Sequence, residues 1–191
     1  MRLRHLVGAA MAAAALSACG GDDTNGTSQG NPSAGGNPPS GGGAQTQLST
    51  ADKIKALEQA GKLPTLDRSS DVKGPDLNAN GIRDDIDVWI EKQGLGNAEK
   101  KAVQQLSRGL QVALLVDLTN PTAIRDAATA NNLAVKCVIT RSPDAGSGYR
   151  TVTDLEKITA NTKSRVKAYL AYNATLDGTV SKSPEGDGCA E

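Results

Sequence analysis

The chain has 191 residues, with 21 basic and 21 acidic side chains, a single His and no Phe. This balance excludes the strongly basic field of nucleic-acid-binding proteins, so no nucleic-acid partner is predicted. The single histidine is His5, which lies in a segment expected to be removed. The mature domain therefore has no imidazole for catalysis or for metal binding.

The first 18 residues have the pattern of an export signal. Arg2, Arg4 and His5 precede an apolar run over residues 6–16, which is too short to span a bilayer stably. We expect residues 1–18 to be a signal peptide. Its loss removes Arg2 and Arg4 from the 21 basic residues and leaves 19 against 21 acidic ones, a net charge near −2.

The next segment, Leu16-Ser17-Ala18-Cys19, resembles the lipobox of bacterial lipoproteins. That resemblance implies a mature chain that starts at an acylated Cys19 and is anchored to a membrane. Gly20 matches the outer-membrane default, with either periplasmic or external display. The alternative is an ordinary signal peptide cut nearby, with Cys19 a spare thiol. Residues 19–47 are rich in Gly, Ser, Asn and Pro, which predicts a flexible linker between the lipid and the folded domain.

Residues 48–191 are expected to form an all-α domain, a small bundle of about five helices without a convincing strand. The apolar spacing and the capping residues place these helices at residues 51–60, 84–92, 97–118, 121 to about 138, and 151 or 153 to about 176. The third helix is expected to be central, and residues 142–150 are interpreted as a glycine-containing loop. In the fifth helix, Val166 and Leu170 are expected to point inward.

One motif in the domain carries metal chemistry. Residues 76–87 fit the pattern D-x-[DN]-x-[DN]-G, in which alternate oxygen ligands wrap a hard cation and Gly81 permits the sharp turn. The candidate ligands for Ca²⁺ are the side chains of Asp76, Asn78, Asn80, Asp84 and Asp87 and the backbone carbonyl of Ile82.

This loop resembles EF-hand-like loops, and more closely those of dockerins and thrombospondin type 3 repeats. It departs from the EF-hand because Asp87 stands where Glu is usual, and because Gly74 and Pro75 argue against an entering helix. The surrounding segment also resembles uncharacterised proteobacterial lipoproteins that carry G-P-D-x-[DN]-x-NG-x-RDD-[IV], which implies no activity. The alternative interpretation is an Asx-rich turn in which Asp84 caps the following helix.

After Cys19 the chain has two cysteines, Cys137 and Cys189. In an oxidising compartment such a pair predicts a disulfide that ties the polar C-terminal segment to the fourth helix. Two free thiols are the alternative.

No convincing catalytic constellation is present. The sequence favours a non-enzymatic binding or structural module whose partner is a protein or another envelope component. The alternative is a His-independent hydrolase of cell-wall or glycan material that uses paired carboxylates, with Asp84, Asp85 and Asp87 as the conceivable acids. The scarcity of aromatic residues disfavours glycan subsites and so supports the first reading.

Overall fold

The computed structural model describes residues 48–190, in which all regular secondary structure is helical. The signal peptide, Cys19 and the linker expected from the sequence lie outside these residues. The described helices are α1 (Thr50–Gln59), α2 (Asp84–Glu91), α3 (Asn97–Leu115), α4 (Pro121–Arg141), α5 (Ala145–Thr159) and α6 (Lys163–Thr175). The all-α prediction is confirmed, with six helices in place of about five.

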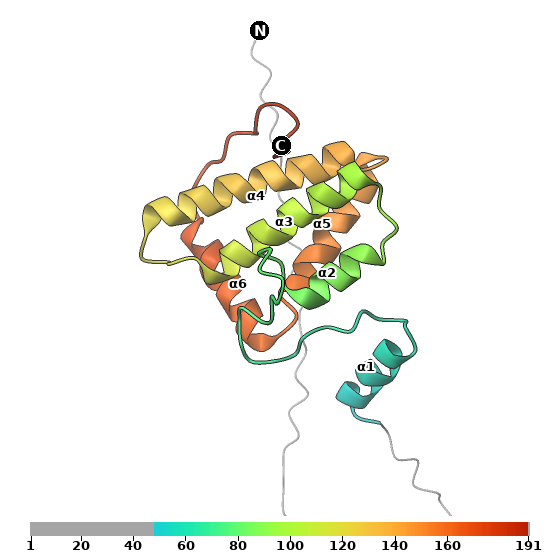
Figure 1. Ribbon diagram of the computed structural model, residues 1–191. Coiled ribbons are helices and arrows are strands. Elements are labelled where there is room, and N and C mark those ends of the chain that lie inside the picture. Colours follow the sequence, from blue (N-terminus) through green and yellow to red (C-terminus); the bar gives the residue numbers. More distant parts are fainter. Residues whose placement is uncertain (1–47, 191) are drawn as a thin grey trace, which may run out of the picture. The chain divides into compact units, whose positions relative to one another are not determined.

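Helix α3 is the central element, as expected, because it contacts α2, α4, α5 and α6. Residues 116–120 reverse the chain, and α4 then runs back alongside α3 (Figure 1). Asn120 caps α4 by accepting hydrogen bonds from the N–H groups of Thr122 and Ala123, and Pro121 occupies the first turn, where its missing N–H costs nothing.

The main core is aliphatic. Its buried members come from α2, α3, α4, α5 and the loop that precedes α2: Ile82, Ile86, Ile90, Ala102, Val103, Leu106, Leu110, Ala134, Cys137, Val138, Val152, Leu155 and Ile158. Trp89 and Tyr169 pack against this cluster. A smaller cluster contains Tyr172 and Ile124. In contrast, α1 buries none of its residues.

The predicted loop at residues 142–150 is wrong, because α5 begins at Ala145. Asp144 and Ser147 form a capping box, so that α5 starts only four residues after α4 ends at Arg141. Gly148 is a contact point and not a helix breaker. A Cβ added there would lie 2.8 Å from the Cα of Ile139, so only glycine lets α5 approach α4 this closely.

The prediction of a single long fifth helix is also wrong, because α5 ends at Thr159 and α6 starts at Lys163. Thr162 accepts a hydrogen bond from the N–H of Arg165 and so caps a new helix. The new helix has its own register, in which the two buried residues are Arg165 and Tyr172. Val166 and Leu170, expected to point inward, are 41% and 60% exposed.

Candidate metal-binding loop

The candidate loop, residues 76–87, connects an extended segment to α2 and is folded around one carboxylate. Asp76 accepts hydrogen bonds from the backbone N–H groups of Asn80 and Gly81, each at 3.1 Å. Gly81 has φ 81°, and Ala79 is the one non-glycine residue with positive φ among residues 48–190. The chain therefore turns sharply at the position where the motif requires glycine.

The two asparagine side chains reach across the loop to its last residue. The Nδ2 groups of Asn78 and Asn80 both donate to Oδ2 of Asp87, at 3.1 and 2.8 Å. The third, fifth and twelfth positions of the motif are thus brought together, with Asp76 holding the backbone between them. What meets Asp87 is a pair of amide N–H groups, so hydrogen bonds close the loop at the positions where a cation would need oxygen ligands.

The two remaining candidate ligands lie where the loop enters α2. Oδ1 of Asp84 accepts from the N–H of Leu77 at 3.0 Å. Asp84 is the first residue of α2, and the residue before the helix is Arg83, which makes no side-chain cap. The alternative interpretation, in which the side chain of Asp84 caps α2, therefore does not hold in this structure. The side chain of Ile82 is fully buried in the core.

The donor set of the loop depends on the asparagines. Within residues 48–190 no three Asp, Glu, His or Cys side chains form a group that could hold a metal ion. Asp76, Asp87 and two amide side chains offer hard oxygen atoms, which suit Ca²⁺. Because an amide nitrogen cannot ligate a cation, Asn78 and Asn80 would have to present Oδ1 to the ion. That rotation would give up the hydrogen bonds that the two Oδ1 atoms accept from the N–H groups of Asn80 and Ile82, at 3.1 and 2.8 Å. After it, the chemistry of the donor set would suit calcium.

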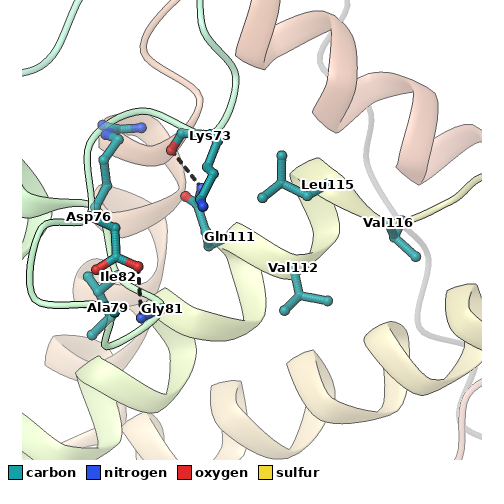
Figure 2. Close-up of a pocket in the computed structure, with 10 residues that line it drawn as sticks. Lys73, Asp76, Ala79, Gly81, Ile82, Gln111, Val112, Leu115 and Val116 are labelled. Carbon is teal, nitrogen blue, oxygen red and sulfur yellow. Dashed lines mark hydrogen bonds between the residues drawn. The ribbon is translucent and has the colours of Figure 1, made fainter.

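Loop residues also form one side of a pocket of about 400 Å³ (Figure 2). The other side is the C-terminal part of α3, where Val112 and Leu115 are about half exposed. Between the two sides, Nε2 of Gln111 donates to the backbone carbonyl of Lys73 at 2.8 Å, whereas its buried Oε1 has no partner among the described residues. The loop therefore borders a concave, mainly apolar surface with one free acceptor.

A buried arginine inside the loop was missed by the sequence analysis. Arg83 is 1% exposed and forms a bidentate pair with the carboxylate of Asp85, at 2.6 and 2.9 Å. Its guanidinium also donates to the carbonyls of Ile158 and Thr159, at 3.0 and 3.2 Å. These carbonyls end α5, where a cation is favourable. Asp85 in turn accepts from the backbone N–H of Asp67 at 2.7 Å.

A second buried arginine fixes the segment that precedes the loop. Arg165, on α6, is fully buried and donates to the carbonyls of Val72, Asp67 and Asp71, at 3.2, 2.7 and 2.8 Å. It also donates to Oδ1 of Asn161 at 2.9 Å and to Oδ2 of Asp67 at 2.5 Å. One guanidinium therefore clamps an extended segment that has no regular structure of its own.

This clamp changes the titration of its carboxylate. Burial raises the pKa of Asp67, but hydrogen bonds from the guanidinium of Arg165 and from the hydroxyl and N–H of Ser69 outweigh it. Together they lower the pKa from 3.8 to about 2. The sequence does not reveal this role, because Asp67 is followed directly by Arg68 and its actual partner, Arg165, lies 98 residues away.

The predicted disulfide between Cys137 and Cys189 is present in the structure, with the two Cα atoms 4.7 Å apart. It ties the C-terminal segment to α4. Gln105, on α3, holds the same segment by donating to the carbonyl of Gly188 and accepting from the N–H of Ala190, at 3.0 and 2.9 Å. The segment is therefore attached to two helices.

Among residues 48–190 no helix is both long enough and apolar enough to cross a membrane. Comparisons with protein-family models, with curated proteins and with solved structures each find no match to this chain. The functional argument accordingly depends on the residues of the chain itself.

Proposed function

We propose that the chain is a lipid-anchored lipoprotein of the bacterial envelope whose helical domain is stabilised by calcium and serves as a non-enzymatic binding module. The observation that carries this proposal is the loop of residues 76–87. In it, Asn78, Asn80 and Asp87 converge while Asp76 holds the turn at Gly81. An Asx-rich turn alone needs no side chain at the twelfth position.

Calcium would be held by the side-chain oxygens of Asp76, Asn78, Asn80, Asp84 and Asp87 and by the carbonyl of Ile82. Bound there, the ion would supply positive charge next to the carboxylates of the loop. Two of the ligands are neutral amides, so the affinity should be modest, in the range of about 10⁻⁴–10⁻³ M typical of extracellular calcium modules. Mg²⁺ should compete poorly because it prefers a smaller octahedral site and keeps its waters.

A binding role is supported by the pocket that the loop borders. Half-exposed Val112 and Leu115 form an apolar wall, and Oε1 of Gln111 is a free acceptor next to it. Such a combination suits a protein segment or another envelope component. The hydrolase alternative stays a prediction. Of its conceivable acids, Asp84 accepts from Leu77 and Asp85 is paired with Arg83.

The membrane anchor is part of the same proposal, and its support is the lipobox at Leu16–Cys19. Mass spectrometry of the mature protein should find an acylated N-terminal cysteine. The variant Cys19→Ser should leave the detergent phase that retains the wild type. An unmodified cysteine in the wild type contradicts the anchor without affecting the calcium proposal.

The calcium proposal is tested by thermal melts in calcium and in chelator, at equal ionic strength. At calcium about 100-fold above the dissociation constant, the native state should gain about 2.7 kcal/mol. For a domain of this size that gain raises the melting temperature by roughly 8 °C. The variants Asp76→Ala and Asp87→Ala should lose this calcium-dependent difference. The control Asp126→Ala, an exposed acid on α4, should keep it.

The difference between the two conditions is compared within each variant, because Asp76→Ala also removes hydrogen bonds that the loop makes without metal. Magnesium at the same concentration should leave the melt near that in chelator. If calcium does not move the wild-type melt, or if both loop variants respond as the wild type does, the segment is only a turn.

A further inference from the structure

A second cavity, separate from the metal-binding loop, lies between α3, α4 and α6 and has a volume of about 210 Å³. Its lining combines aliphatic and polar side chains, including Leu106, Leu110, Asn131, Glu156, Tyr169 and Tyr172. The volume corresponds to several water molecules, which is enough for a ligand of a few heavy atoms.

Two polar atoms in this lining lack partners. The hydroxyl of Tyr172, a residue only 3% exposed, and Oδ1 of Asn131 are both buried without a hydrogen bond among the described residues. Burial raises the pKa of Tyr172, and the nearby side-chain amide of Asn131 weakens this rise without making a hydrogen bond of good geometry, so the phenol is neutral at pH 7. Buried polar groups in native proteins almost always have a partner. A small molecule in the cavity can supply the missing hydrogen-bond partner.

The charge of the lining indicates what kind of partner fits. Glu156 is the one charged residue that lines the cavity, and the lining contains no Lys or Arg. Its Oε1 accepts from the hydroxyl of Tyr169 at 3.2 Å, and within the described part of the chain Glu156 has no ion pair. The wall therefore presents an unneutralised carboxylate, a free amide oxygen and a phenol next to aliphatic side chains.

We propose that this cavity binds a small primary ammonium compound with a short alkyl chain. An ammonium group has three donors, and the lining offers three acceptors in Glu156, Asn131 and Tyr172. Leu106 and Leu110 provide the apolar surface for the alkyl part. This site goes beyond the proposed calcium role and does not depend on it.

The C-terminal segment closes one side of the cavity. Thr179 and Ser181 belong to its lining and also to that of a neighbouring pocket of about 460 Å³. The segment is held by the Cys137–Cys189 disulfide and by a hydrogen bond from Lys136 to a backbone carbonyl. Breaking the disulfide should loosen this wall and weaken binding.

The test is calorimetric titration of the purified, oxidised chain with n-butylammonium chloride in the presence of chelator. Saturable binding with a dissociation constant near 1 mM is expected for so small a ligand. Sodium chloride, 1-butanol and sodium butyrate are the matched probes, since they lack either the alkyl chain or the positive charge. None of the three should bind measurably.

The variants distinguish specific binding in the cavity from a general attraction of cations to an acidic surface. Glu156→Gln should weaken butylammonium binding at least about tenfold, because a hydrogen bond to a charged group is lost. Tyr172→Phe, which removes only the unpartnered hydroxyl, should weaken it several-fold. Asp154→Asn, an exposed acid on the same helix, should leave binding unchanged. Circular dichroism should show the same helicity for all variants.

Three results would overturn the proposal: no saturable binding of butylammonium by the wild type, equal binding of 1-butanol, or equal weakening by Glu156→Gln and Asp154→Asn. The first means that the cavity holds water only. Because chelator is present throughout, each result is independent of whether the loop binds calcium.

Discussion

Replacing Arg165 should destabilise the domain more than any exposed substitution, because its guanidinium connects α6 to an extended segment that lies far away in the sequence. In Arg165→Met the apolar volume is kept and all five hydrogen bonds are lost. The carboxylate of Asp67, whose side chain is 18% exposed, then has no cation beside it. Breaking a buried pair by removing one partner costs about 3–5 kcal/mol.

The lower part of that range is expected, since the extended segment can relax and let its carbonyls meet water. A loss of about 3 kcal/mol lowers the melting temperature by roughly 10 °C in a domain of this size. Arg165→Lys should lie between the wild type and Arg165→Met, because one ammonium cannot reach acceptors distributed over a planar fork. Arg125→Met, on the exposed side of α4, is the matched control and should change little.

Urea denaturation followed by circular dichroism measures the effect as a shifted midpoint at unchanged slope. The double variant Arg165→Met/Asp67→Asn should be less destabilised than the sum of its two single variants, because the second change removes the carboxylate that the first leaves unpaired. A loss below about 1 kcal/mol for Arg165→Met, or strict additivity in the double variant, would show that the clamp contributes no more than an ordinary surface pair.

Three further outcomes are expected. The pKa of Asp67 is depressed from 3.8 to about 2 by hydrogen bonds that exceed the effect of burial. The stability that the charged Asp67 carboxylate gives the folded domain is therefore complete above pH 3.8. It is lost as the pH falls towards 2, by up to about 2 kcal/mol. Acid unfolding of Asp67→Asn should lack this step. Reduction of Cys137–Cys189, which closes a loop of 52 positions, should cost about 4 kcal/mol and expose the C-terminal segment to proteolysis. Identical melting and cleavage with and without reductant would contradict this. Gly148→Ala should destabilise by about 1–3 kcal/mol, because its Cβ meets the backbone of Ile139. Gly146→Ala in the same helix meets only a side chain within 3 Å, so thermal melts should show no comparable loss.

The sequence predicted the elements whose burial is set by local periodicity. In α3, residues Leu106, Leu110 and Leu114 recur at helical spacing, and all three are buried. The same holds for Ile86 and Ile90 in α2. A 3.6-residue repeat of aliphatic side chains has one stable solution in water, which is an amphipathic helix packed on a core. The central position of α3 was also predicted, although Val112 and Leu115 in its apolar final turns are about half exposed.

The elements that the sequence predicted wrongly depend on contacts between distant parts of the chain. The break between α5 and α6 is favoured by Thr162, a weak cap, and by Arg83, which binds the last carbonyls of α5 from 75 residues away. Val166 and Leu170 continue the apolar pattern of α5 across the break, so periodicity alone predicts one helix. Gly148 marks a close helix contact, and only the position of α4 distinguishes that role from a turn.

The candidate loop combines both kinds of information. Its motif could be recognised in the sequence. The two residues that fix the loop to the domain, Ile82 and Arg83, are almost completely buried. No local sequence pattern indicates that Arg83 is a core residue. Since these residues belong to the core, the second half of the loop is ordered by packing and by the end of α5 before any ion is considered. Metal-dependent modules that fold only on binding lack such anchoring. Calcium should therefore appear as a higher melting temperature of an already folded domain, and the chelated protein should keep its helices.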